Sequence, residues 1–164
     1  MEIILIRHAE RERDPSLGDD KDLPLTADGK KQTKALALRL QRAGCQPALY
    51  LVSRYAHAVE TGRRLQGHIS ASPPAPVIAL STLTPHEGYT VEGIIEETRE
   101  NGHDLWNLNQ VVIVLHHPRL NQLLAKFTGQ AESPQAPEFA QAVRVVGRSL
   151  KDFVNGKASE ISRL

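Results

Sequence analysis

The sequence is poor in cysteine, in aromatic residues and in net charge, and each scarcity excludes a class of function. Cys45 is the only cysteine, so neither an internal disulfide nor a multi-cysteine metal site is possible. Aromatic residues account for 4% of the 164 residues, and the formal net charge is +1. Such a chain lacks the broad basic surface and the stacking platforms that nucleic acids require. We therefore expect no nucleic-acid partner.

Long apolar runs are also missing. No stretch approaches the roughly 20 apolar residues that a membrane-spanning helix needs. The N-terminus carries an acid at Glu2 where a signal peptide would be basic. Hydrophobic residues at 40% and charged residues at 24% are ordinary values for a globular chain. We expect a single soluble, cytoplasmic domain over residues 1–164, with no membrane partner.

The apolar residues that are present gather in short runs that end abruptly in polar side chains. Each run is typical of a strand buried in a parallel sheet, and helical patterns separate the runs. This alternation predicts right-handed βαβ crossovers and an α/β fold, with three layers α/β/α and a mainly parallel central sheet. The three clearest runs are 3–6 followed by Arg7 and His8, 48–52 followed by Ser53 and Arg54, and 111–115 followed by His116 and His117.

The other segments are consistent with this pattern. Helices are expected from the N-cap Thr26 to the stop at Gly44, around 57–65, and over 91–100 and 120–128, with a short strand at 77–80. Residues 11–22 are dense in charge and form either a loop that touches the substrate or a solvated connector. The tail stays open, because 141–146 fits an edge strand or part of a helix. Asn155-Gly156 indicates a hairpin-type turn.

In a parallel sheet, the carboxyl ends of the strands lie at one edge, where ligands bind in open α/β folds. Arg7 is a permanent planar cation suited to phosphate, and His8 can serve as a nucleophile near neutral pH. The strand endings together indicate an anion pocket that contains two histidines, His8 and His116. The chemistry that fits is phosphoryl transfer to an imidazole, with cations and a second imidazole on the phosphoryl oxygens.

A metal site is the alternative use of seven histidines. The adjacent His116 and His117 on an extended segment point to opposite faces, so the two cannot ligate one ion. No His-Glu-x-x-His or His-x-Asp spacing occurs. The sequence therefore predicts neither a metal nor another cofactor.

Four segments resemble, in the same order, those of the histidine phosphatase (phosphoglycerate mutase-like) superfamily. The resemblance implies a phosphoglycerate mutase-like fold. Because the chain is too short for a large helical insertion over the site, it is most similar to the short bacterial protein-phosphohistidine phosphatases. The matching segments are Arg7-His8-Ala9-Glu10, the Leu-Thr-x-x-Gly-x-x-Gln pattern of 25–32, the Ser-to-Thr segment 53–61, and 114–118 with His116.

The resemblance also implies roles for individual residues. His8 would be the nucleophile that becomes phosphorylated, Arg7 a phosphate clamp, and His116 the second imidazole on the phosphoryl oxygens. We expect the pKa of His8 to be lowered beside Arg7, which keeps its ring nucleophilic at neutral pH. The acid that the family often places in a loop would be Glu87, with a solvated loop as the alternative.

The chain departs from the family pattern at three positions. Ala9 and Leu115 replace glycines, and His57 stands where the second phosphate-binding arginine is expected. A charged hydrogen bond to phosphate is worth roughly 1.5–3 kcal/mol, so its loss costs about one or two powers of ten in rate. Either Arg54, three residues upstream, or a protonated His57 is expected to supply the missing contact.

These observations predict a metal-independent phosphatase that works through a phosphohistidine on His8. Protein phosphohistidine is the leading substrate, so the expected partner is a phosphorylated protein. A small-molecule phosphomonoesterase acting on a sugar phosphate or similar metabolite is the first alternative. The second alternative is a non-catalytic phosphate-binding module, because His57 stands in place of an arginine.

Overall fold

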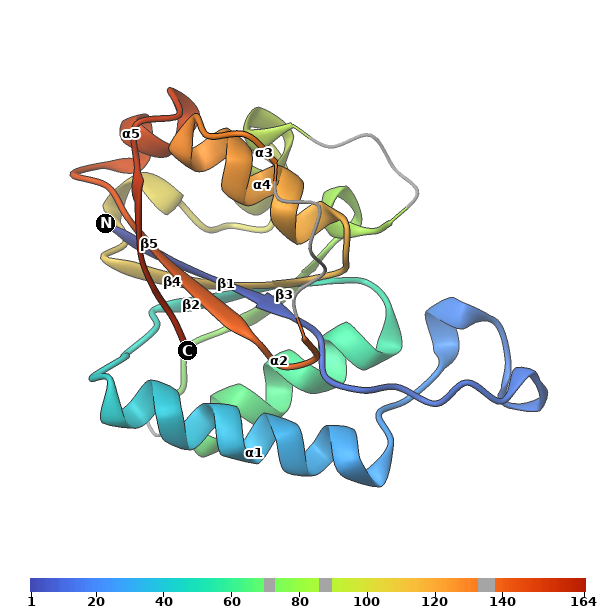
Figure 1. Cartoon of the computed structure of the whole chain (residues 1–164). Helices are drawn as coiled ribbons and strands as arrows, with labels where there is room; N and C mark the ends of the chain where they lie inside the picture. Colours follow the sequence, from blue (N-terminus) through green and yellow to red (C-terminus); the bar gives the residue numbers. More distant parts are fainter. Residues whose placement is uncertain (70–72, 86–89, 133–137) are drawn as a thin grey trace.

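The computed structural model describes residues 1–69, 73–85, 90–132 and 138–164. Its centre is a six-stranded sheet in the order β3-β2-β4-β1-β5-β6 (Figure 1). The strands are β1 Glu2–Arg7, β2 Leu49–Ser53, β3 Val77–Leu80, β4 Gln110–Leu115, β5 Ala142–Val146 and β6 Ser159–Arg163.

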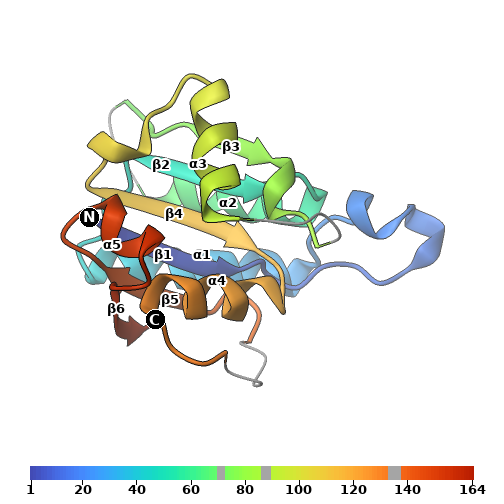
Figure 2. The ribbon, with the colours of Figure 1, turned by 90° about the horizontal axis from the view of Figure 1, so that it is seen from above.

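Helices cover both faces of this sheet, as the alternating pattern predicts. On one face lie α1, Ala27–Arg42, and α2, Ala56–His68 (Figure 1). On the other face lie α3, Val91–Glu100, α4, Arg119–Thr128, and the short α5, Leu150–Val154. Seen from above, α3 lies toward β2 and β3, whereas α4 and α5 lie toward β1 and β5 (Figure 2). The predicted three-layer α/β/α architecture is confirmed.

Four neighbouring strands, β3, β2, β4 and β1, run parallel. The last two strands reverse the pattern, because β5 is antiparallel to β1 and β6 is antiparallel to β5. Arg7 at the end of β1 is paired with Leu115 at the end of β4. The residues that follow these two strands, His8 and His116, are therefore placed at the same level of one sheet edge.

The apolar runs are buried on both sides, which is why they show no alternation. Ile3 and Leu5 pack into the core beneath α3 and α4, whereas Ile4 and Ile6 pack into the core against α1 and α2. All four side chains are at most 2% exposed. This double burial fixes β1 rigidly in the middle of the sheet and anchors the polar residues at its end.

The structure settles the tail differently from one sequence-based expectation. Residues 142–146 form a strand, but β5 lies between β1 and β6 and is not an edge strand. Asn155-Gly156 does not join two strands, because it directly follows α5 and leads into β6. Gly156, with φ of 64°, supplies the left-handed residue after that helix. Among the described residues, no helix has the length and apolar character needed to cross a membrane.

The charged segment between β1 and α1 extends away from the sheet at the carboxyl end of β1 (Figures 1 and 2). It contains two short 3₁₀ turns, Pro15–Leu17 and Asp20–Asp22. A bridge between Arg11 and Leu25 closes its base. Both ends of the segment therefore lie near the carboxyl edge of the sheet, where His8 and His116 also lie.

Candidate active site

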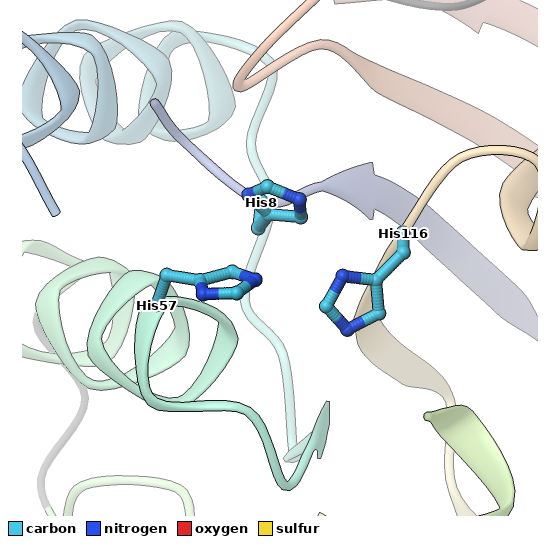
Figure 3. Close-up of side chains that lie close together, drawn as sticks. All are labelled: His8, His57 and His116. Carbon is cyan, nitrogen blue, oxygen red and sulfur yellow. The ribbon is translucent and has the colours of Figure 1, made fainter. Parts of the chain in front are cut away.

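Three histidines from three different elements meet at the carboxyl edge of the sheet (Figure 3). His8 follows β1, His116 follows β4, and His57 lies in the first turn of α2. The ring centroid of His8 lies 4.3 Å from that of His57 and 4.9 Å from that of His116, and the other two centroids are 5.2 Å apart. The structure therefore brings together His8 and His116, which were expected in one pocket, and it places the candidate phosphate contact His57 beside them.

The ring of His8 is held in one tautomer. Its Nδ1 lies 2.9 Å from the carbonyl oxygen of Ala9, and a carbonyl can only accept, so Nδ1 carries the proton. The lone pair of the neutral ring is then on Nε2. The backbone of Ala9 is fixed in turn, because its N–H donates to Thr61 Oγ1 at 3.1 Å, and Thr61 donates to the carbonyl of His57 at 2.7 Å.

The start of α1 packs directly on the chain that follows His8. A Cβ on Gly29 would lie 2.0 Å from the carbonyl oxygen of Glu10, so only glycine permits this approach. Gln32 accepts a hydrogen bond from the N–H of Glu10, and Thr26 caps the helix by accepting from the N–H of Gly29. The Leu-Thr-x-x-Gly-x-x-Gln pattern therefore corresponds to a set of contacts that position the loop after His8.

His116 is positioned by the end of the neighbouring strand β2. Its Nε2 lies 2.8 Å from Ser53 Oγ, and Ser53 is completely buried. A hydroxyl can donate or accept, so the proton of His116 can lie on either nitrogen. Tyr55 packs edge-on against the same ring, with centroids 5.0 Å apart.

His57 is entirely buried. Its Nδ1 lies 3.2 Å from the carbonyl oxygen of Leu23, so Nδ1 donates and Nε2 carries the lone pair. Within the described part of the chain, Nε2 of His57 has no hydrogen-bond partner. A buried polar atom without a partner is costly, so it marks a place where a ligand is expected.

All three imidazoles are neutral at pH 7. Burial lowers the pKa of His8 to about 3, and repulsion by His57 adds to the effect. Burial also lowers the pKa of His57 to about 4 and that of His116 to about 2. The expected depression of the His8 pKa is confirmed in direction, although burial contributes more to it than Arg7 does.

His8 and His116 line a pocket of about 330 Å³ that is rich in arginine. The guanidinium carbon of Arg7 lies 4.0 Å from the ring centre of Phe139, which forms one wall. Arg11 pairs with Asp20 across the charged loop. The full lining is Arg7, His8, Arg11, Arg13, Asp20, Pro85, His116, His117 and Phe139. Three arginines against one aspartate make this pocket suited to an anion.

Arg54 lies apart from this lining. Its Nη2 is 3.2 Å from Glu97 Oε1 on α3. Glu97 also accepts hydrogen bonds from the N–H and hydroxyl groups of Ser81 and Thr82. Burial raises the pKa of Glu97, but these hydrogen bonds outweigh it and lower the pKa to about 2. Arg54 is therefore bound to a permanent carboxylate.

Sequence reasoning missed several residues that the structure places at the site. Arg13 and Phe139 line the pocket, and Ser53 orients His116. The cluster of arginines directly after His8 was the available signal for Arg11 and Arg13, whereas nothing local distinguishes Phe139. His117 also lines the pocket. The candidate acid Glu87, with His86, lies outside the described residues.

A neutral histidine, a second imidazole and an arginine-lined pocket at the edge of a doubly covered α/β sheet form an arrangement suited to phosphoryl chemistry. Residues 3–110 match the family model of the histidine phosphatase superfamily, branch 1, so the chain belongs to this superfamily. The match ends before His116. No curated protein sequence matches the chain at a significant level.

Solved structures of the same fold include phosphatases with different substrates. The protein histidine phosphatase SixA, complexed with tungstate, is 20% identical with a TM-score of 0.78, over 100% of this chain and 96% of that one. Alpha-ribazole phosphatase from Shigella flexneri is 18% identical with a TM-score of 0.65, over 98% and 95%. A mycobacterial glucosyl-3-phosphoglycerate phosphatase is 16% identical with a TM-score of 0.65, over 97% and 96%. At these identities the likeness concerns the fold.

Proposed function

We propose that this chain hydrolyses protein phosphohistidine through a phosphohistidine on its own His8. The observation that carries the proposal is the state of His8: a buried neutral ring whose Nε2 lone pair is free, beside a pocket lined by Arg7, Arg11 and Arg13. An imidazole of lowered pKa keeps its lone pair at neutral pH. The arginines offset the charge of the phosphoryl oxygens.

In the first step, the Nε2 lone pair of His8 attacks phosphorus, and the bond from phosphorus to the substrate's imidazole nitrogen breaks. The substrate imidazole leaves with the bonding pair and takes a proton from water. The ring of His8 becomes cationic, with Nδ1–H still bonded to the carbonyl of Ala9. His116 donates from Nδ1 to a phosphoryl oxygen while its Nε2 accepts from Ser53.

In the second step, water attacks the phosphoryl group on His8. The phosphorus–nitrogen bond breaks, the electron pair returns to Nε2, and inorganic phosphate leaves. His8 is restored to its neutral form, which burial favours. The cycle needs no redox partner and consumes one water molecule for each phosphate released.

The ionisable side chains of the pocket favour phosphohistidine as the substrate. An alcohol leaving from a phosphomonoester needs a general acid, whereas an imidazole is a good leaving group without one. Among the described residues of the pocket, Asp20 is the carboxylate, and it is paired with Arg11. A substrate that needs no acid suits this lining.

The non-catalytic alternative is favoured by one observation, the neutral His57 in place of an arginine. Because Nδ1 of His57 donates to Leu23, its Nε2 has no proton to give to phosphate, so the site binds the transition state more weakly than it would with a second guanidinium. A domain of this kind would hold a phosphorylated partner without turning it over.

Parallel assays with p-nitrophenyl phosphate and a phosphohistidine-bearing protein test the proposal. They compare the wild type, His8→Ala and a control, His103→Ala, which removes a histidine outside the pocket. We expect turnover of the phosphohistidine protein in the wild type and the control, and at least about a thousandfold less in His8→Ala. Faster turnover of p-nitrophenyl phosphate would favour a small-molecule phosphatase. Phosphate binding without turnover would favour the non-catalytic module.

A further inference from the structure

His8, His57 and His116 form an arrangement beyond what phosphoryl transfer needs. One ring nitrogen from each lies within 4.8 Å of those from the other two. In Figure 3, the three rings face a common space from three separate elements. Adjacency excludes His116 and His117 as joint ligands of one ion, whereas His8, His57 and His116 are far apart in the sequence and converge only through the fold.

In each of these rings one nitrogen is bonded to an oxygen, and the other has no hydrogen-bond partner within the described part of the chain. Nδ1 of His8 and Nδ1 of His57 donate to the carbonyls of Ala9 and Leu23, and Nε2 of His116 is bonded to Ser53. Histidines that bind a metal through one ring nitrogen usually donate a hydrogen bond from the other nitrogen to a carbonyl or another oxygen. Such bonds fix the tautomer that presents a lone pair to the ion.

His57 supplies the most direct sign of a missing ligand. Its side chain is completely buried, and its Nε2 has no hydrogen-bond partner among the described residues. The ring centroid of His57 lies 4.3 Å from that of His8 and 5.2 Å from that of His116. An ion placed between the three rings would satisfy this orphaned nitrogen together with the lone pairs of the other two rings.

The donor set identifies the kind of ion. Three imidazoles without a carboxylate suit Zn²⁺, Co²⁺, Ni²⁺ or Cu²⁺ and disfavour Mg²⁺ and Ca²⁺, which require oxygen ligands. Zinc–nitrogen bonds of about 2.0–2.1 Å in a tetrahedron place the ligand nitrogens about 3.3 Å apart, so the three nitrogens, which now lie within 4.8 Å of one another, must move closer together when the ion binds. Because Arg7 and Arg11 oppose a dication, the fourth ligand is expected to be an anion from the pocket.

We infer that His8, His57 and His116 bind one Zn²⁺-type ion, and that the ion and the phosphoryl group compete for the same lone pair on His8. The substitution of His57 for arginine converts a phosphate contact into the third metal ligand. The Ser53 hydroxyl permits both states, since it donates to Nε2 of His116 in the phosphate state and accepts from it in the metal state.

Metal binding is measured without substrate, so that it does not depend on the proposed phosphatase activity. Co²⁺ is titrated into the full chain while the visible absorption of a tetrahedral ion is followed, and Zn²⁺ is titrated by calorimetry. The variants are His57→Arg, which removes the third ligand, and His103→Gln, a control outside the cluster. Thermal unfolding without metal checks that each variant is folded.

We expect the wild type and His103→Gln to bind one equivalent of either ion, and His57→Arg to bind it at least about a hundredfold more weakly. Absence of binding to the wild type, or equal binding by folded His57→Arg, would overturn the inference whatever the enzymatic activity. The competition between the ion and the phosphoryl group rests on the proposed function. If they compete for His8, one equivalent of Zn²⁺ inhibits the wild type and leaves His57→Arg active. Uninhibited wild-type turnover with Zn²⁺ bound would refute this competition.

Discussion

The strands β1 and β2 both end at the same edge of the sheet. An arginine is the last residue of β1 and another directly follows β2, yet only the first of them lines the pocket. Arg7 at the end of β1 lines the pocket and stacks on Phe139. Arg54 after β2 is paired with Glu97, and the residue that α2 brings to the site is the neutral His57. The topology of the sheet thus decides which residues lie near the pocket, and Arg54 is bound to Glu97 apart from the pocket lining.

The largest effect is expected from removing Arg7, the arginine that lines the pocket. Arg7→Ala is expected to lower kcat/KM about a hundredfold, because a charge-assisted contact to phosphate is worth roughly 1.5–3 kcal/mol. Steady-state kinetics on the phosphohistidine protein measure this change. A rate within twofold of the wild type would show that Arg7 does not touch the transferring group.

The role of Glu97, the carboxylate that binds Arg54, is tested by removing its charge. Glu97→Gln keeps the shape of the side chain but replaces the carboxylate, which accepts hydrogen bonds from Ser81 and Thr82, with a neutral amide. We expect the free energy of unfolding to fall by about 2 kcal/mol, measured by urea denaturation at pH 7. Thr90→Val, which removes a cap on α3 but no charge, is a control with an expected loss of about 1 kcal/mol. Unchanged stability of Glu97→Gln would contradict this anchoring role.

The neutral histidines predict a pH dependence of stability. Their folded-state pKa values lie below the ordinary value of 6.5, so below pH 6.5 the unfolded chain takes up protons that the folded chain does not. The free energy of unfolding should therefore fall as the pH is lowered from about 6.5 to about 5, and each histidine contributes up to about 1.4 kcal/mol per pH unit. Removing one of them in His57→Gln should make this fall shallower. Equal slopes for the two chains would mean that His57 is not buried in its neutral form.

A further test places at position 57 the arginine that the family pattern has there. His57→Arg is expected to raise kcat/KM about tenfold, because a guanidinium adds a charged contact that a neutral ring lacks. The assay is hydrolysis of the phosphohistidine protein, with His57→Lys testing whether the planar fork is needed or only the charge. A lower rate in folded His57→Arg would show that His57 already performs a specific task in turnover.

The smallest effect is expected at the arginine that does not reach the pocket. Arg54→Ala should leave kcat/KM within about twofold of the wild type and cost less than about 1 kcal/mol of stability, since its pair with Glu97 is largely exposed on the arginine side. The same kinetic and urea assays measure both quantities. A loss comparable with that of Arg7→Ala would mean that Arg54 leaves Glu97 to bind phosphate.

Much of the fold was predictable because it depends on local pattern. The doubly buried runs at 3–6 and 111–115 are apolar along their whole length, and the abrupt change to Arg7-His8 and His116 indicates where each strand ends. The helix starting after Thr26 was predictable from its cap. The place of β5 inside the sheet was not, because an antiparallel strand at the end of the chain has no local marker of its neighbours.

The site was predictable only in outline. The convergence of His8 and His116 follows from parallel topology alone. The pairing of Arg54 with Glu97 joins residues 43 apart in sequence, and no local pattern records it. The tautomer of His57 depends in the same way on the carbonyl of Leu23, which is 34 residues away in the sequence. Such contacts decide the charge state and availability of each side chain, so sequence could name the candidates but not their states.

In the proposed mechanism, His8 itself carries the phosphoryl group during turnover. The most direct measurement is to mix the chain with a phosphohistidine protein, quench within one turnover, and determine the mass of each peptide. We expect a peptide that contains His8 with the added mass of one phosphoryl group. This modification should be labile in acid and absent from His8→Ala. Turnover of the substrate with no phosphoryl group on His8 at any quench time would contradict this mechanism.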